Sequence, residues 1–264
     1  MKKKSRVGKV YRGLLKAFGP QGWWPVTPGG AVSPVYTPLF YGARSDAEIA
    51  EICAGAILTQ NTAWTNVGKA LAGLHGAGLL SAERIAACRL PRLAALIRPS
   101  GYYRQKARRL RDFFARAAKE HPEGLERWFR SAPAEALRRE LISYKGVGPE
   151  TADSIVLYAA GRPSFVIDAY SRRIGERLGL GRGGHYDYWK ALFEAGLPRR
   201  PEVYNEYHAL LVKLGKDFCR KTLPLCCGCP LRRECDYAAV RRKDHGKDRS
   251  SARQGRIQKG SVRH

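Results

Sequence analysis

The stretch that decides the fold spans residues 141–173 and reads LISYKGVGPETADSIVLYAAGRPSFVIDAYSRR. It begins at the end of an amphipathic helical pattern, passes through the tight turn Gly146-Val147-Gly148, and starts a second helix at Pro149. We expect both glycines to supply backbone angles that a side chain forbids and to leave the amides of the turn bare. Free amides at a helix start form an anion site, so the turn is expected to bind a phosphate.

The composition indicates a polyanionic partner. The 264 residues include 48 Lys or Arg and 23 Asp or Glu, a formal net charge of +25. Nucleic acid explains this charge best, and its binding would be strongly salt-dependent. A membrane surface is the rival, but no long uncharged apolar segment occurs. The basic N-terminus resembles the start of a signal peptide, yet Lys9, Arg12 and Lys16 break its apolar part, so we expect no export and a cytoplasmic protein.

Helical periodicity covers most of the chain, and no alternating strand pattern occurs, so the expected fold class is all-α. Residues 19–44 are rich in Pro, Gly and aromatic residues and are expected to form an ordered loop. Residues 240–264 are expected to be a disordered basic tail that either adds phosphate contacts or is simply solvated. The helices are expected over residues 1–18, 45–60, 63–75, 81–88, 90–97, 102–119, 125–130, 133–143, 186–195 and 201–218.

Four cysteines near the C-terminus have the spacing C-x6-C-x2-C-x5-C, and they are Cys219, Cys226, Cys229 and Cys235. Thiolates grouped this closely can converge on one soft metal centre, and the spacing alone allows either zinc or a four-iron cluster. Such a group indicates a reducing compartment rather than a disulfide framework. Cys227 lies outside the pattern, and Cys53 and Cys88 fall on apolar helical positions, where we expect them to be buried.

A lone acid, Asp168, follows the hairpin by about twenty residues and begins another helix after an apolar run. Together with the glycine turn and the cysteine loop, it resembles the helix-hairpin-helix, Gly/Pro and Asp module of the endonuclease III superfamily of DNA glycosylases (HhH-GPD). The resemblance implies a two-lobed helical fold and double-stranded DNA with a damaged base as partner of a monomer. It also implies a [4Fe-4S] cluster on the four cysteines. One lobe would comprise residues 1–44 and 144–239, and the other residues 45–143.

Asp168 is the catalytic residue that the resemblance implies. Cleavage of the base–sugar bond builds positive charge on the sugar, which a nearby carboxylate stabilises while it orients or deprotonates the attacking water. The alternative is that Asp168 only caps its helix. Relatives that also cut the strand carry a hairpin lysine that forms a Schiff base, and here Glu150 stands at that position. This favours a monofunctional glycosylase without abasic-site lyase activity, with Lys145 as the remaining candidate amine.

Three further segments look like the 3-methyladenine DNA glycosylase III branch of this superfamily: GWWP (22–25), LTQNT (58–62) and RPSGYY (98–103). This likeness implies that the substrates are alkylated purines such as 3-methyladenine and 7-methylguanine. These bases carry a formal positive charge, so they leave easily and stack well on aromatic rings. Members of that branch need not have the cysteine loop, whereas this chain has it.

The same likeness implies a base pocket. Trp23 or its neighbour Trp24 would stack against one face of the flipped base and Trp64 against the other, with Tyr170 as a further wall and Lys216 as a pocket lysine. Core packing is the alternative for the tryptophans, and a phosphate contact is the alternative for Lys216.

The DNA-contacting residues follow from the same segments. Gln60 matches a residue that fills the hole left by the flipped base, and Tyr102 matches a wedge that enters the stack; otherwise they are ordinary helix-end and surface side chains. The hairpin residues expected to contact DNA are Lys145, Gly146, Val147, Gly148, Glu150 and Thr151.

Two other functions fit the sequence. One is a glycosylase, glycosylase-lyase or mismatch glycosylase acting on damaged or deaminated pyrimidines. The other is a noncatalytic DNA-binding scaffold, although a pure DNA binder gains nothing from a carboxylate such as Asp168 facing phosphates. His208 is interpreted as a packed helix residue and is left outside the site.

Overall fold

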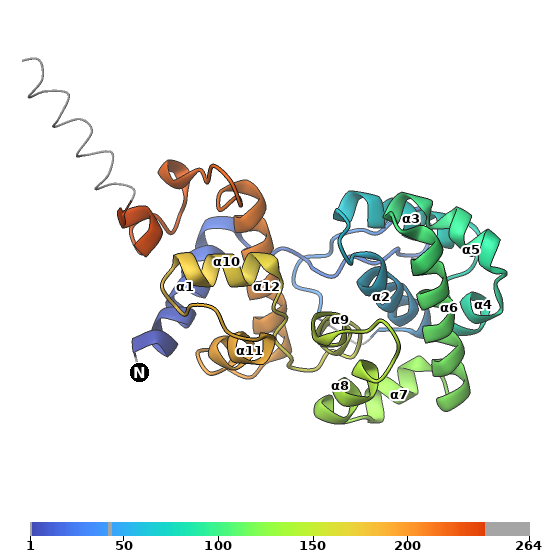
Figure 1. Cartoon of the computed structure of the whole chain (residues 1–264). Helices are drawn as coiled ribbons and strands as arrows, with labels where there is room; N and C mark the ends of the chain where they lie inside the picture. Colours follow the sequence, from blue (N-terminus) through green and yellow to red (C-terminus); the bar gives the residue numbers. More distant parts are fainter. Residues whose placement is uncertain (1, 42–43, 241–264) are drawn as a thin grey trace, which may run out of the picture.

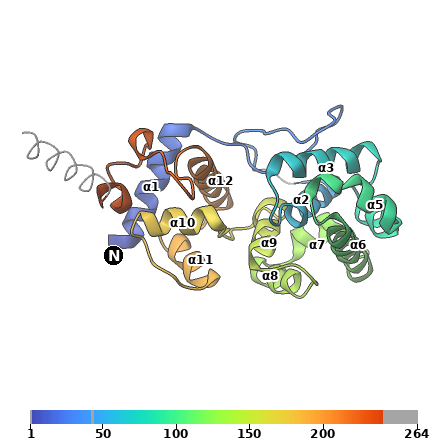
Figure 2. The ribbon, with the colours of Figure 1, turned by 45° about the horizontal axis from the view of Figure 1, so that its top comes forward.

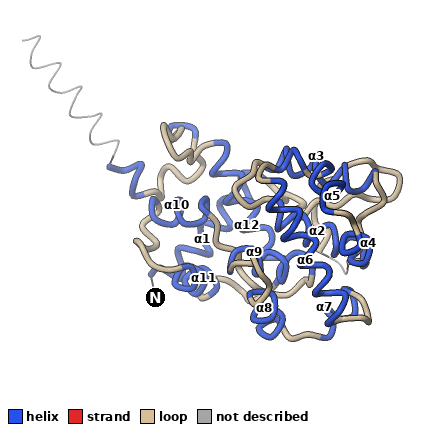
Figure 3. The backbone as a smooth tube through the Cα atoms, turned by 45° about the vertical axis from the view of Figure 1, so that its right-hand side comes forward, coloured by secondary structure: helices blue, strands red, loops and turns tan. Residues whose placement is uncertain are grey.

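A computed structural model describes residues 2–41 and 44–240, so the predicted basic tail lies outside the described residues from position 241 on. The described chain is helical and has no strand, only an isolated antiparallel bridge between Val26 and Val35 (Figure 3). The expectation of an all-α fold is therefore confirmed. None of the described helices has the length and apolarity of a membrane span. The helices are α1 (Lys2–Phe18), α2 (Asp46–Leu58), α3 (Trp64–Gly76), α4 (Ala82–Ala87), α5 (Leu90–Leu96), α6 (Tyr103–Glu120), α7 (Leu125–Ser131), α8 (Ala134–Ile142), α9 (Pro149–Ser154), α10 (Ala169–Arg177), α11 (Tyr186–Glu194) and α12 (Pro201–Asp217), with the short turns η1 (Arg98–Ser100), η2 (Ile155–Ala159) and η3 (Cys226–Gly228).

The helices form two lobes (Figure 1). Helices α1, α10, α11 and α12 and the cysteine segment form the terminal lobe, and α2 to α9 with η1 and η2 form the helical lobe. The chain crosses between the lobes first along residues 19–41, which pass beside α2 and α3 (Figure 2), and again after η2. The structure places the hairpin helix in the helical lobe, whereas the sequence analysis assigned residues from 144 onward to the terminal lobe. The reason is the fully apolar run of η2, which is buried against α2.

The terminal lobe joins the two ends of the described chain. Val7, Val10 and Leu14 form the apolar face of α1 and are completely buried against α12. The ring of Tyr11 adds a contact with Tyr207, with the centroids 5.3 Å apart. Each buried aliphatic side chain contributes roughly 1.5–3 kcal/mol, so the first helix is an integral part of the lobe that carries Asp168.

Buried polar contacts fix the lobes relative to each other. The carboxylate of Asp153 on α9 is fully buried and accepts hydrogen bonds from Arg138 Nε of α8 at 2.9 Å and from Lys190 Nζ of α11 at 3.0 Å. On the other side of the boundary, Tyr41 donates its hydroxyl to Glu206 of α12 at 2.8 Å. Because a buried carboxylate left without its partners is costly, these contacts hold the lobes in one arrangement.

Candidate active site and DNA interface

The hairpin turn has one glycine that the backbone requires. Gly146 has φ +85°, and a Cβ there would lie only 2.9 Å from the side chain of Arg109. Gly148 has φ −91°, an ordinary angle, and open space around it. The expectation that both glycines supply forbidden angles is therefore wrong for Gly148, which instead leaves the start of α9 uncovered. Pro149 begins α9, where the first amides have no intrahelical partner.

Asp168 caps α10 with one oxygen, and its other oxygen takes no part in the cap. Its Oδ1 accepts hydrogen bonds from the backbone N–H of Ser171 at 2.7 Å and from the Ser171 hydroxyl at 2.8 Å. Its Oδ2 faces Nε2 of His208 at 3.5 Å, and the side chain of Asp168 is 14% exposed. The helix-cap and catalytic interpretations are therefore compatible, because each uses a different oxygen.

The surroundings keep Asp168 ionised. Burial alone would raise the pKa of Asp168, but the neighbouring His208 and the two bonds from Ser171 outweigh it and leave the pKa below its usual value. The N-terminus of α10 also favours a negative charge at this position. A carboxylate of this kind is poised to stabilise a cation that forms beside it.

Glu150 brings a second carboxylate close enough to Asp168 for their charges to interact. Glu150 lies in the first turn of α9. Partial burial of its carboxylate and, secondarily, the charge of Asp168 raise the pKa of Glu150 to about 7. Its position in the hairpin is the one at which the sequence analysis looked for an amine. Lys145 lies in the turn itself and is exposed.

The three tryptophans predicted to bind a base lie together. The ring centroid of Trp64 is 4.9 Å from that of Trp23 and 5.2 Å from that of Trp24, so the rings touch one another. A base between two of them would need about 7 Å, twice the 3.4 Å stacking spacing of DNA. Trp24 is buried, whereas Trp23 and Trp64 are only half-buried. The exposed Tyr36, which the sequence analysis did not select, packs on Trp23 at 5.7 Å.

Tyr170 and Lys216 lie at the junction of α10 and α12 rather than in the tryptophan cluster. The Tyr170 ring covers Gly215, where a Cβ would come within 2.2 Å of a ring carbon. The guanidinium of Arg173 lies over the ring, 5.0 Å from its centroid. Lys216 is the next residue along α12 and is exposed. The glycine at position 215 is thus explained by the close packing of Tyr170.

Gln60 and Tyr102 lie on two neighbouring loops of the helical lobe. The Gln60 amide donates hydrogen bonds to the carbonyl of Gly146 at 3.1 Å and to the hydroxyl of Thr151 at 3.0 Å, which ties the end of α2 to the hairpin. Thr151 and the turn residue Val147 are buried beneath it. Tyr102 is 74% exposed, as a wedge would need to be.

Lys106 holds these loops in place, although the sequence alone did not indicate this role. Its ammonium group is buried and donates to the carbonyls of Leu58 and Ser100, each at 2.7 Å, and to the hydroxyl of Thr62 at 2.6 Å. One side chain therefore joins the end of α2 to the loop that carries Tyr102. The only sign of this role in the sequence is that the lysine falls on the apolar face of the α6 helical pattern.

The four patterned cysteines line one small apolar cavity together with Phe218, Pro224 and Tyr237. A tetrahedral zinc ion with Zn–S bonds of about 2.3 Å holds its sulfurs about 4 Å apart. Among the described residues, no three of these Sγ atoms lie mutually within 4.8 Å, which is wider than the sulfurs around a single zinc ion. Cys227 is exposed and lies outside this cavity, and Cys53 and Cys88 are buried, as predicted.

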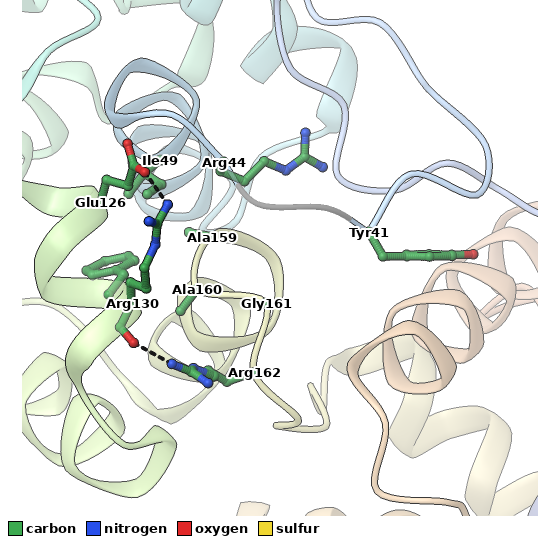
Figure 4. Close-up of a pocket in the computed structure, with 10 residues that line it drawn as sticks. Tyr41, Arg44, Ile49, Glu126, Arg130, Ala159, Ala160, Gly161 and Arg162 are labelled. Carbon is green, nitrogen blue, oxygen red and sulfur yellow. Dashed lines mark hydrogen bonds and ion pairs between the residues drawn. The ribbon is translucent and has the colours of Figure 1, made fainter.

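A separate cavity lies away from this site. It measures about 260 Å³ and lies where α2 begins and η2 ends, lined by Tyr41, Arg44, Arg130 and Arg162 among others. The hairpin and Gln60 lie at the opposite ends of the same helices, so roughly 20 Å separates them from the cavity. The three guanidinium groups point in different directions (Figure 4), and Arg130 pairs with Glu126. They do not converge on one ligand.

Two further buried residues join the site. His208 of α12 and Tyr158 of η2 form a 2.6 Å hydrogen bond between Nδ1 and the phenol oxygen. The opposite ring nitrogen of His208 faces Asp168. A histidine on an apolar helix face is most often a packing residue, so the sequence alone did not place His208 in the site. No spacing in the sequence pairs positions 158 and 208.

Comparison with known proteins gives consistent matches. The family profile of the HhH-GPD superfamily of base excision DNA repair proteins matches residues 54–199. A protein of Methanocaldococcus jannaschii whose assigned name is that of a DNA repair glycosylase is 40% identical over 230 residues, 87% of this chain and 95% of its own length. The structure of the H. pylori 3-methyladenine DNA glycosylase bound to 1,N6-ethenoadenine is similar with a TM-score of 0.63 and 27% identity, over 81% of this chain and 97% of that one. A non-covalent endonuclease III–DNA complex has the same fold, with a TM-score of 0.71 and 22% identity, over 91% and 98% of the two chains.

Proposed function

The chain belongs to the HhH-GPD superfamily of base excision DNA repair glycosylases, and from this premise we propose that it hydrolyses the glycosidic bond of alkylated purines without cutting the DNA strand. The observation that carries the proposal is the pair of interacting carboxylates at the starts of α9 and α10. Asp168 presents one free oxygen there, and Glu150 occupies the hairpin position at which a lyase would need an amine.

Charge supports a cationic substrate. In a chain with a net charge of +25, the ionised Asp168 places a negative charge in the site, and Glu150 adds to it as the pH rises above about 7. A 3- or 7-alkylated purine brings a formal positive charge to this site, so it is attracted where a neutral base is not. The cluster of Trp23, Trp24 and Trp64 offers aromatic faces to such a base once the rings separate.

The proposed reaction needs no metal or acid at the base. The hairpin amides hold a phosphate, Tyr102 enters the stack, and the damaged nucleotide leaves the helix. The base departs with the electrons of the glycosidic bond and becomes neutral, while Asp168 Oδ2 stabilises the cationic sugar. Water then adds its hydroxyl to C1′ and gives its proton to Asp168 or to solvent. The products are a free base and an abasic site.

A panel of duplexes tests the substrate class. We expect release of 3-methyladenine and 7-methylguanine at rates at least ~100-fold above those for hypoxanthine, uracil and thymine glycol, because only the first two carry the positive charge. Initial rates of base release measure this, with an Asp168→Asn preparation as the control for contaminating glycosylases. A preference for uracil or thymine glycol would instead identify a pyrimidine glycosylase. Tight binding without product on any lesion would identify a scaffold.

Borohydride trapping tests the absence of lyase chemistry. We expect no covalent adduct between the wild-type protein and abasic DNA, because a carboxylate at position 150 cannot form an imine. The variant Glu150→Lys, which restores an amine at this position, serves as the positive control and should be trapped. A wild-type adduct that disappears in Lys145→Ala would show that Lys145 performs the lyase reaction, and the proposal of a monofunctional enzyme would be wrong.

We further propose that Cys219, Cys226, Cys229 and Cys235 hold a [4Fe-4S] cluster. The width of the sulfur arrangement supports a cluster over a single ion. When bound, the cluster would supply a rigid anchor for the loop, since hydrolysis requires no electron transfer. The loop would then present the exposed Arg220 to a DNA phosphate.

A further inference from the structure

A buried row of side chains connects the tryptophan cluster to Asp168 across the lobe boundary. The ring of Tyr158 lies 5.2 Å from that of Trp24, centroid to centroid, within the helical lobe. Its hydroxyl lies 2.6 Å from Nδ1 of His208, which belongs to α12 of the terminal lobe. The other nitrogen of His208 lies 3.5 Å from Asp168 Oδ2. Tyr158 is 3% exposed and His208 is 7% exposed, so solvent screens neither contact strongly.

The two neighbours of His208 select one orientation of its protons. A carboxylate opposite Nε2 favours a proton on that nitrogen, because a lone pair there would face a negative charge. In the neutral ring Nδ1 must then accept, so the Tyr158 hydroxyl donates to it. Nε2 has no hydrogen-bond partner among the described residues, and its 3.5 Å separation from Asp168 is long for a hydrogen bond. The ring is therefore aimed at the free carboxylate oxygen by its contact with Tyr158.

We propose that His208 is a positioning residue for Asp168, and that Tyr158 from the opposite lobe orients it. The inference rests on the proposed glycosylase function, in which Asp168 Oδ2 meets the sugar. Tyr158 also touches Trp24, so a base that displaces the tryptophan rings would move a neighbour of the residue that orients His208.

The charges around Asp168 determine how loss of His208 would act. Burial and then the charge of Asp168 raise the pKa of Glu150 on α9, and burial followed by the charges of Asp168 and Glu206 raises the pKa of Tyr158. His208 is the group among these that favours the ionised carboxylate, together with the capping Ser171. Removal of the imidazole removes the main group that opposes the effect of burial, which raises the pKa of Asp168. Activity should then be lost first on the acidic side.

Two amide substitutions of His208 separate its two contacts. Gln places an amide near Nε2 and retains a donor to Asp168, whereas Asn reaches only to the place of Nδ1. We expect His208→Asn to lower kcat ~10- to 100-fold with KM changed by less than about twofold, since a hydrogen bond to a charged group contributes on this scale. The acidic limb of its pH profile should move up by about one unit. His208→Gln should recover kcat to within about fivefold of wild type, and Tyr158→Phe should lose about three- to tenfold.

His185→Asn is the matched control, because His185 is exposed at the start of α11 and lies outside the proposed site. Circular dichroism and binding to an abasic-site analogue establish that each variant is folded. Unchanged kcat and pH profile in folded His208→Asn would overturn the inference. Equal losses in the Gln and Asn variants would also overturn it, because a purely structural role predicts no rescue by the longer amide.

Nitrogen NMR of the His208 ring tests the contact independently of turnover. The wild-type spectrum should show the proton on Nε2, and Asp168→Asn and Tyr158→Phe should each shift the ring signals. His208→Gln assigns the resonance by its loss. A proton on Nδ1 in the neutral wild-type ring would contradict the inference. If the wild type cleaves no lesion, the proposed function fails, and the spectra still decide whether His208 is held against Asp168.

Discussion

The variant Asp168→Asn should lower turnover of the preferred lesion by about 10³-fold or more, while affinity for lesion-containing DNA stays within about twofold. The reason is that this side chain both caps α10 and carries a negative charge, and the substitution removes only the charge. Asn retains an oxygen that caps α10 through Ser171, and Asn is among the best capping residues. It removes the negative charge of the carboxylate. Single-turnover base release and fluorescence anisotropy measure the two quantities.

Asp112→Asn makes the same chemical change on α6, where the carboxylate is 55% exposed and lies only near Arg111. Its turnover should match that of the wild type. If Asp168→Asn remained active within about tenfold, Asp168 would be only a helix cap, and Glu150 would be the next residue to test. If it lost DNA binding as well as turnover, the cap would be needed for the shape of the interface.

The helices were predictable because the signals that define them are local. The apolar stripe of α1 and the reciprocal bonds between Ser45 and Glu48 at the start of α2 are encoded within a few residues. Asp168 could be selected as a candidate in the same way, since it stands in a short motif at a fixed distance from the hairpin. The patterned cysteines could be selected in the same way, because they share one loop.

The remaining features depend on contacts between distant positions. Lys106 meets Leu58 and Ser100, and Tyr158 meets His208, through packing of whole helices that no periodicity reveals. The lobe assignment of the hairpin failed for the same reason: a run as apolar as η2 can be buried against either lobe. Tyr170 was selected because it is close to Asp168 in sequence. Its position in the first turn of α10 places its ring against Gly215 of α12.

The variant Cys226→Ser should abolish the brown colour and the absorbance in the blue that a [4Fe-4S] cluster gives to the wild-type protein. Iron content should fall from about four atoms per chain to below one, because a serine hydroxyl is a poor replacement for a thiolate ligand. Affinity for DNA should fall by at least ~10-fold, since the loop that presents Arg220 loses its anchor. Visible absorbance, iron analysis and DNA binding measure these effects.

The neighbouring residue provides the control. Cys227→Ser changes an exposed thiol outside the cavity and should retain colour, iron and affinity. Because the two variants differ only in which of two adjacent sulfurs is removed, the comparison isolates ligation from general loss of thiols. A colourless wild-type protein with about one zinc per chain would contradict the cluster. In that case the Sγ atoms must move together from their present separation, and the loop between residues 219 and 235 would contract around the ion.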